Sequence, residues 1–271
     1  IIVSLVGSEM CIRDRLIYCS ITGFGQDGPR AHKPGYDFMI QGMTGIMDIT
    51  GEPEGMPQKV GVAFADIFTG LYGVIGIQAA LAQRERTGLG QHVDMALFDC
   101  MLAAQANQNL NYLSTGESPK RMGNAHPSIV PYQVFPVIDG HIVIACGNNR
   151  QFHNLAQALG RPDWIDDPVF ADNMTRIANR TEVVSQITKQ LSTLTKLEVL
   201  TSLEAAGVPS GPINTVAEAL EDPQTLYREM RIAPEGIPGV RTPIKFSKSS
   251  LKLKRAAPGL GEHNKSGDLK S

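Results

Sequence analysis

The chain has 271 residues, of which 42% are hydrophobic and 19% charged, and its formal net charge is −2. This composition is typical of a soluble globular protein with enough apolar material for one large core or two smaller ones. The near-neutral charge, without any basic tract, makes nucleic-acid binding a poor first hypothesis, so we expect no nucleic-acid partner. The four cysteines and six histidines show no metal-ligand spacing, which favours reduced thiols and no metal site. No apolar run approaches the roughly 20 residues of a membrane span, so we expect a cytoplasmic protein without membrane contact.

The first residues differ in texture from the rest of the chain. The segment SLVGSEMCIRDR, residues 4–15, follows neither a helical nor a strand period. It is similar to translated sequencing-adapter read-through. We therefore expect residues 1–14 to lie outside the fold and the natural protein to continue upstream.

The first half of the chain alternates between strand and helix patterns. A β-rich run from Leu16 to Thr22 predicts a buried strand, and the glycines and proline of GFGQDGP predict a loop after it. Apolar spacing predicts a helix from about Asp37 to Ile46. A long helix follows from Asp66 to about Arg86, with Asp66 as its N-cap and Gly88 as its stop signal.

The next strand is predicted in HVDMAL, followed by a helix from near Phe98 toward Tyr112. Strand–helix–strand–helix order indicates an α/β layer with parallel pairing. Residues 114–131 are rich in Gly, Pro, Ser and Asn and read as a linker. Beyond them, YQVFPVIDGHIVIACG predicts a β-hairpin that turns at Asp139-Gly140.

The remaining residues predict helices followed by short strands and turns. The expected helices are Gln151 to Leu159, Thr181 to Leu191, Lys196 to Ala206, and a short one opened by Asp222-Pro223. The expected division is residues 1–112 as part of a large domain, 113–222 as linker and small domain, and 223–271 as a segment returning to the large domain.

One glycine motif invites a cofactor assignment that we reject. Gly23, Gly25 and Gly28 match a dinucleotide-binding fingerprint that follows a strand. That mechanism needs a helix to begin there and meet a pyrophosphate. Pro29 and the Lys33-Pro34-Gly35 run forbid a sustained helix. A loop whose backbone a ligand approaches stays open as an interpretation.

Asp66 and the glycines after it each have an ordinary structural explanation. Aspartate is among the best helix caps, and spacing alone favours that role. As a nucleophile, a carboxylate at a helix start would gain anion stabilisation from the N-terminus. Gly70, Gly73 and Gly76 together weaken the helix by about 3 kcal/mol. For the last two, the expected reason is close approach of another helix, whereas Gly70 could leave room for a cofactor arm.

Other chemistry-bearing residues carry weaker signals. Asp94 and Asp99 are explained by exposure and helix capping, and His126 by a satisfied loop hydrogen bond. No serine or cysteine has a histidine at an informative spacing.

Taken together, several segments resemble the CaiB/BaiF, or class III, CoA-transferases. They are RLIYCSITGFGQDGP, PGYDFMIQGMTGIMDITGEPEG, VGVAFADIFTGLYGVIGIQAAL, TGLGQHVDMALFD, GNAHPSIVPYQVFPVIDGHIVIACGNN, AAGVPSGPINTVAEALEDPQ and RAAPGLGEH. The resemblance covers nearly all of Arg15 to His263. In texture the chain is most similar to members that use succinyl-CoA and dicarboxylic acids.

The resemblance implies a fold and a set of site residues. The fold would be α/β, with a Rossmann-like large domain, a smaller α+β domain and two chains interlocked as a homodimer. Asp66 in FADIFTG occupies the place of the family's nucleophile. The loop Thr22, Gly23, Phe24 and Gly25 would lie beside coenzyme A. Tyr36, Asn124 and His126 are candidate substrate contacts.

The resemblance also implies the reaction. Coenzyme A would pass from an acyl-CoA, with succinyl-CoA the expected donor, to a carboxylic acid through an aspartyl-CoA thioester, and no cofactor would stay bound. GNAHPS replaces the glycine-rich loop of formyl-CoA transferases, which disfavours oxalate. Racemases of the family carry a histidine where this chain has Tyr36, which disfavours racemisation. The alternatives left open are an acyl-CoA racemase and an inactive truncated transferase.

Overall fold

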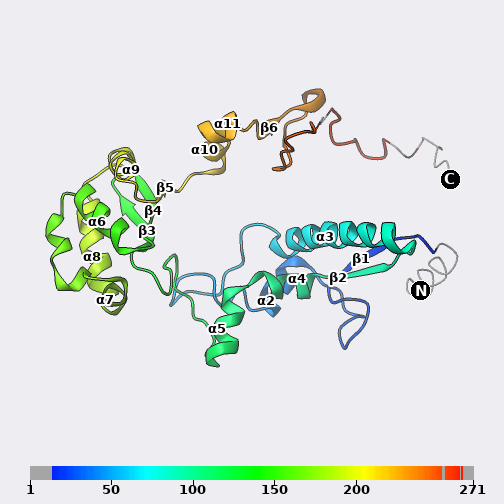
Figure 1. Ribbon diagram of the computed structural model, residues 1–271, viewed down its shortest axis with the longest axis horizontal. Helices are drawn as coiled ribbons and strands as arrows, with labels where there is room; N and C mark the ends of the chain where they lie inside the picture. Colours follow the sequence, from blue (N-terminus) through cyan, green and yellow to red (C-terminus); the bar gives the residue numbers. More distant parts are fainter. Residues whose placement is uncertain (1–13, 252–253, 263, 265–271) are drawn as a thin grey trace. The chain divides into compact units, whose positions relative to one another are not determined.

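The computed structural model describes residues 14–251, 254–262 and 264, and the chain divides into two compact units, residues 1–134 and 135–271. Figure 1 traces the elements along the chain. We expected residues 1–14 to lie outside the fold; of these, all but Asp14 are outside the described residues. The three-part domain division stays a prediction. The mixed α/β composition agrees with the α/β class expected from the sequence.

Unit 1 is built around two parallel strands and a long helix. Strands β1 and β2 pair in parallel, with Tyr18 opposite His92 and Thr22 opposite Ala96, so the predicted parallel pairing is confirmed. The elements of this unit are β1 (Tyr18–Thr22), α2 (Asp37–Met43), α3 (Phe64–Thr87), β2 (His92–Ala96), α4 (Leu97–Ala104) and α5 (Asn107–Thr115).

Gly73 and Gly76 of α3 face the strands and not another helix, which corrects the sequence interpretation. A methyl group on Gly73 would lie 3.8 Å from Ile21 Cδ1, and one on Gly76 would lie 3.0 Å from Val93 Cγ1. Figure 1 shows α3 running alongside the β1–β2 pair. At Gly76 a side chain would be too close to Val93, whereas the contact at Gly73 is an ordinary one.

Two further expectations in unit 1 are wrong. Helix α3 begins at Phe64 after Ala63, so Asp66 lies in its first turn and is not its N-cap. The helix expected from Phe98 to Tyr112 is broken into α4 and α5 at Ala106, whose φ of 40° is left-handed. Next to this break, the Gln105 side chain donates to the Thr44 carbonyl at 2.6 Å.

The predicted hairpin and the four predicted helices of unit 2 are present, whereas the helices Asn173–Ala178 and Val216–Glu221 were not predicted. Strands β3 and β4 form the predicted hairpin, and β5 joins them by antiparallel pairing with β4. The strands are β3 (Tyr132–Val137), which crosses the boundary between the units, β4 (Gly140–Ala145), β5 (Ser210–Pro212), β6 (Arg231–Ile232) and β7 (Gly239–Val240). The α-helices are α6 (Asn149–Ala158), α7 (Asn173–Ala178), α8 (Arg180–Leu191), α9 (Lys196–Ala205), α10 (Val216–Glu221) and α11 (Pro223–Tyr227), and the 3₁₀ helices are Pro162–Ile165, Pro168–Phe170 and Pro234–Gly236.

The largely aliphatic core of unit 2 contains an aromatic cluster and the buried guanidinium of Arg176. Trp164 and Phe170 stack at 5.2 Å between ring centroids, and both are almost fully buried. Arg176 is fully buried, donates to the Phe170 carbonyl at 2.8 Å, and lies over the Phe152 ring. Burial lowers the pKa of Arg176. The hydrogen bond and the ring contact offset part of the cost of burying its charge.

Helix α3 corrects the expectation that no segment has the length and composition of a membrane span. Within the described residues it is the one helix that passes this test, and 22% of its apolar window is buried. Its exposed apolar side chains include Leu71, Val74 and Ile75. Length and composition do not separate a membrane span from a helix packed inside a protein, so the cytoplasmic location stays a prediction.

Candidate functional site

The predicted nucleophile, Asp66, lies in the first turn of the long helix α3, next to a small apolar core. Its neighbour Ala65 is fully buried in a cluster with Ile40, Leu97 and Met101, whereas Asp66 itself is exposed. The helix start is therefore fixed by packing on one side while the carboxylate faces outward. A carboxylate presented in this way can meet a ligand without leaving its helix.

The N-terminus of α3 is capped by another helix. Asp37, the first residue of α2, accepts from the Ala65 N–H at 2.9 Å with Oδ1. The Ile67 N–H donates to the Ala63 carbonyl at 3.0 Å. Because both amides are engaged, neither serves as a free donor toward an oxyanion above Asp66.

The glycine loop packs directly against the residues that precede α2. A methyl group on Gly23 would lie 2.5 Å from the Gly35 Cα, which is closer than backbone atoms allow. Gly25 has a φ of +87°, and its N–H donates to the Thr22 Oγ1 at 2.9 Å. Phe24 packs against the core cluster beneath Asp66. Contact with Gly35 and a left-handed turn account for these glycines, so their presence is not by itself a sign of a ligand.

The far end of this loop is held by the strand pair. Ser20 lies opposite Asp94 in the β1–β2 register. The Ser20 hydroxyl is 2.7 Å from His92 Nε2 and donates to Asp94 Oδ1 at 3.3 Å. Asp94 Oδ2 accepts from the Gln26 N–H at 2.8 Å. Asp94, which the sequence explained by exposure alone, therefore anchors the loop predicted to lie beside coenzyme A.

The three predicted substrate contacts have different surroundings. Tyr36 is 73% exposed and precedes α2, so it is a chain neighbour of the α3 cap. Asn124 is exposed, and the preceding residue, Gly123, donates its N–H to the Gly51 carbonyl at 3.0 Å. His126 Nδ1 accepts from the Ser128 N–H at 3.1 Å, as the interpretation of a satisfied loop histidine expects. The structure thus brings Tyr36 and the glycine loop near the α3 start, and the roles of these residues, like those of Asn124 and His126, stay predictions.

Near this region one arginine contacts two aromatic rings, and two cysteine thiols have raised pKa values. The Arg30 guanidinium lies over the Phe24 and Phe98 rings at 6.0 and 5.9 Å. Burial, with the Asp94 charge, raises the pKa of the Cys19 thiol, and burial raises that of Cys100. Among the described residues, no three His, Cys, Asp or Glu side chains cluster as a metal site.

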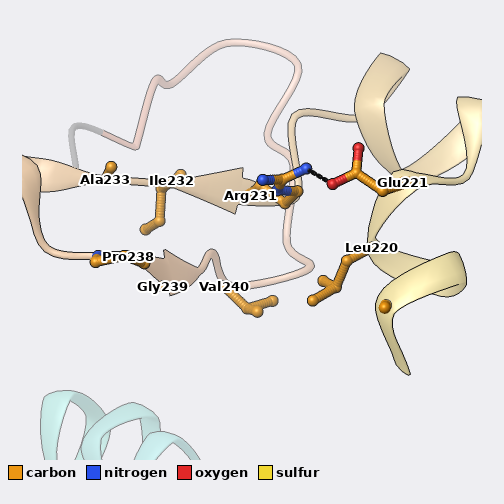
Figure 2. A pocket seen from close by; sticks show the side chains of 9 residues that line it. Leu220, Glu221, Arg231, Ile232, Ala233, Pro238, Gly239 and Val240 are labelled. Atoms are coloured by element: carbon orange, nitrogen blue, oxygen red, sulfur yellow. Dashed lines mark hydrogen bonds and ion pairs between the residues drawn. The ribbon is translucent and has the colours of Figure 1, made fainter. Parts of the chain in front are cut away.

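One cavity lies elsewhere, in unit 2. It measures about 690 Å³ and is lined by residues of α10, β6 and β7. Figure 2 shows Leu220 and Glu221 of α10 facing the β6–β7 hairpin, with Glu221 paired to Arg231. Its lining is mostly apolar, and none of the predicted site residues belongs to it. We therefore do not assign the chemistry to this cavity.

Sequence reasoning missed the side chains that support the predicted site. Asp37 and Gln41 contact residues far along the chain, and no short motif reports such a contact. Asp94 had one available signal, since parallel pairing of the two predicted strands places it beside Ser20, next to the loop. That register was not drawn from the sequence.

Comparison with known proteins finds similar sequences and structures over most of the chain. The family model for CoA-transferase family III matches residues 10–264. Succinate–glutarate CoA-transferase of Agrobacterium fabrum is 51% identical over 93% of this chain and 64% of its own length. Acetyl-CoA:oxalate CoA-transferase of Acetobacter aceti is 42% identical over 87% of this chain and 61% of its own length. A crystal structure of a CaiB/BaiF family protein from Brucella suis superposes with a TM-score of 0.86, at 56% identity, over 96% of this chain and 69% of that one. The chain thus spans less than two thirds of the curated relatives named here.

Proposed function

Because this chain belongs to CoA-transferase family III, we propose that it transfers coenzyme A between carboxylic acids through Asp66. The observation that carries the proposal is a carboxylate exposed on a helix start whose backbone is fixed by packing and by Asp37. Relatives named as CoA-transferases of succinate, glutarate and oxalate support the reaction class. No racemase stands among the relatives compared above, and position 36 is tyrosine, so we do not carry that alternative further.

The proposed reaction runs in four balanced steps. Asp66 attacks the thioester carbonyl of the donor, and the C–S bond breaks to give a mixed anhydride and the thiolate of coenzyme A. The thiolate then attacks the Asp66 carbonyl, which forms aspartyl-CoA and releases the donor acid. The acceptor carboxylate attacks this thioester and regenerates thiolate and anhydride. Finally, the thiolate attacks the acceptor acyl carbonyl, which releases acceptor-CoA and restores Asp66.

Both covalent intermediates are sensitive to water, so the site must be closed while they exist. In the structure Asp66 is exposed. We therefore propose that bound acyl-CoA, or a second chain of the expected homodimer, covers Asp66 during turnover. The Rossmann-like organisation and the interlocked dimer are proposals that rest on the family resemblance.

The expected donor is succinyl-CoA and the expected acceptor a dicarboxylic acid. Support comes from the succinate–glutarate relative at 51% identity. The oxalate relative at 42% identity makes oxalate a necessary second acceptor in any assay. Transfer to glutarate faster than to oxalate would agree with the absence of the glycine-rich loop, and the reverse order would contradict it.

The test is intact-protein mass spectrometry after incubation with succinyl-CoA. We expect an adduct of the mass of coenzyme A less one water in the wild-type chain and none in Asp66→Asn. Asp99→Asn is the matched control, because Asp99 is also an exposed acid at the third position of a helix in unit 1. Transfer at the wild-type rate by Asp66→Ala would refute the assignment. A chain that shows neither an adduct nor a thermal shift with coenzyme A would be the inactive alternative.

A further inference from the structure

We propose that Asp37 and Gln41 of α2 are positioning residues that determine where the Asp66 carboxylate stands. The inference rests on the proposed function, since it assigns a task to residues that support the proposed nucleophile. Neither residue was singled out by the sequence, and neither needs to touch substrate. Their contacts run instead to the backbone on the approach to Asp66.

The first step concerns the helix start. The first N–H groups of a helix have no partner within it and are normally capped by the preceding side chain. The residue before α3 is Ala63, which has no side chain able to accept a hydrogen bond. Asp37 provides the missing acceptor for the Ala65 N–H from 28 positions earlier in the chain. The start of α3 is therefore tied to α2 and not to its own approach segment.

The second step concerns the approach segment itself. The Gln41 side chain is fully buried, and its Oε1 accepts from the Val60 N–H at 2.9 Å. Its Nε2 donates to the Asp37 Oδ2 at 2.9 Å and to the Val62 carbonyl at 3.4 Å. A buried amide bonded on both its oxygen and its nitrogen is costly to displace. Asp37 and Gln41 therefore form one unit that holds the backbone on both sides of Ala63.

The third step links this geometry to reactivity. Asp66 follows Ala65 directly, so a shift of the Ala65 backbone moves the carboxylate with it. Misplacement of a reacting group by about 1 Å can cost a factor of about 100 in rate. Gly35, which precedes α2, also contacts Gly23 of the glycine loop. The same helix thus sets the position of the nucleophile relative to the loop proposed to lie beside coenzyme A.

A purely structural role would lower stability without a specific loss of rate, so the experiment must separate the two. Gln105→Ala is the matched control, because Gln105 is also a nearly buried glutamine of unit 1 that donates to a backbone carbonyl, here that of Thr44. Within the described part of the chain, no hydrogen bond joins Gln105 to residues 60–65. The variants are Asp37→Ala, Asp37→Asn, Gln41→Ala and Gln105→Ala, each in the whole chain.

Two measurements are made on each variant. The first is the rate of aspartyl-CoA formation at saturating succinyl-CoA, followed by intact mass. We expect Asp37→Ala and Gln41→Ala to slow it by about 10- to 100-fold, with little change in the succinyl-CoA concentration that half-saturates the rate. Asp37→Asn keeps an oxygen acceptor for the Ala65 N–H but sets an amide donor against Gln41 Nε2, so it should recover only part of the rate. Gln105→Ala should form the adduct at the wild-type rate.

The second measurement is amide hydrogen exchange in peptides that contain Ala65, made without substrate. Exchange should become faster by roughly fivefold or more in Asp37→Ala and stay near the wild-type rate in Asp37→Asn. Wild-type adduct formation in Asp37→Ala, or an equal loss in Gln105→Ala, would overturn the positioning inference. If the wild-type chain forms no adduct, the proposed function is refuted. The exchange measurement still tests the anchoring of Ala65 by Asp37 in that case, because unchanged exchange in Asp37→Ala would overturn it.

Discussion

Replacing the three glycines of α3 by alanine one at a time should give different stabilities although the substitution is the same. Within a helix, Gly→Ala gains about 0.8–1.0 kcal/mol through backbone entropy. At Gly70 no atom lies within 4 Å of the new methyl group, so the full gain is expected. At Gly73 the nearest atom is Ile21 Cδ1 at 3.8 Å, an ordinary contact, and the result should be similar.

Gly76 should behave differently because its methyl group would lie 3.0 Å from Val93 Cγ1. Overpacking of this kind costs typically 1–3 kcal/mol. Set against a helix gain of about 1 kcal/mol, the free energy of unfolding should stay unchanged or fall by up to about 2 kcal/mol. The difference between Gly70→Ala and Gly76→Ala should therefore be about 1–3 kcal/mol.

The assay must report unit 1. The one tryptophan, Trp164, lies in unit 2, so its fluorescence is unsuitable. Hydrogen exchange of peptides from α3, measured as a function of urea concentration, follows the helix directly. In a double-mutant cycle, Gly76→Ala should cost less stability in the Val93→Ala background than in the wild type, because the opposing methyl group is removed. Equal stabilities for Gly70→Ala and Gly76→Ala, or a cycle without coupling, would refute the steric argument.

Three further predictions concern other parts of the chain. In the capping box of α9, Thr195 and Glu198 bond each other's backbone, and Thr195→Ala removes the side-chain half of it. The free energy of unfolding, measured by urea denaturation, should fall by about 1 kcal/mol. A fall below about 0.3 kcal/mol would contradict this prediction. The Thr195 N–H, and after it the Thr195 hydroxyl, lower the pKa of Glu198. The folded state therefore binds fewer protons, and the stability from this group is present above the ordinary pKa of glutamate and lost as pH falls through the lowered pKa. Thr195→Ala keeps the N–H and should flatten that acid limb only in part. Burial raises the pKa of Cys146 to about 12, so this thiol should resist iodoacetamide at pH 8 until the protein unfolds, as peptide mapping would show. Asp94→Asn weakens the acceptor for the Gln26 N–H. The acyl-CoA concentration needed for half-saturation should rise several-fold, with a smaller effect on the maximal rate. A larger effect on the maximal rate than on half-saturation would exclude a role confined to the loop.

The local elements of this fold could be predicted because their signals lie within a few residues. Asp139-Gly140 marks the hairpin, and Gly88 ends α3 with a φ of 78°. The start of α3 was misplaced for a physical reason. Asp66 has the chemistry of an N-cap, but the cap is provided by Asp37, and a contact over 28 positions leaves no local pattern.

The candidate site could be located from the sequence only through its resemblance to a family. Residue types alone favoured a capping role for Asp66 and exposure for Asp94. The hydrogen bonds that connect these residues depend on strand register and on the packing of α2 against α3. The break at Ala106 has the same origin, because alanine gives no sequence signal for a left-handed backbone.

The contact between Gly23 and Gly35 restricts which sequences this fold can accept. Each position excludes even the smallest side chain because the opposing atom is backbone, which cannot rotate away. A library with both codons fully randomised should, after selection for folded protein, return glycine at both positions. A second change elsewhere cannot easily compensate, because the obstacle at either position is the main chain of the other. In chimeras made with related sequences, the segments that carry Gly23 and Gly35 should therefore pack together whenever both positions are glycine.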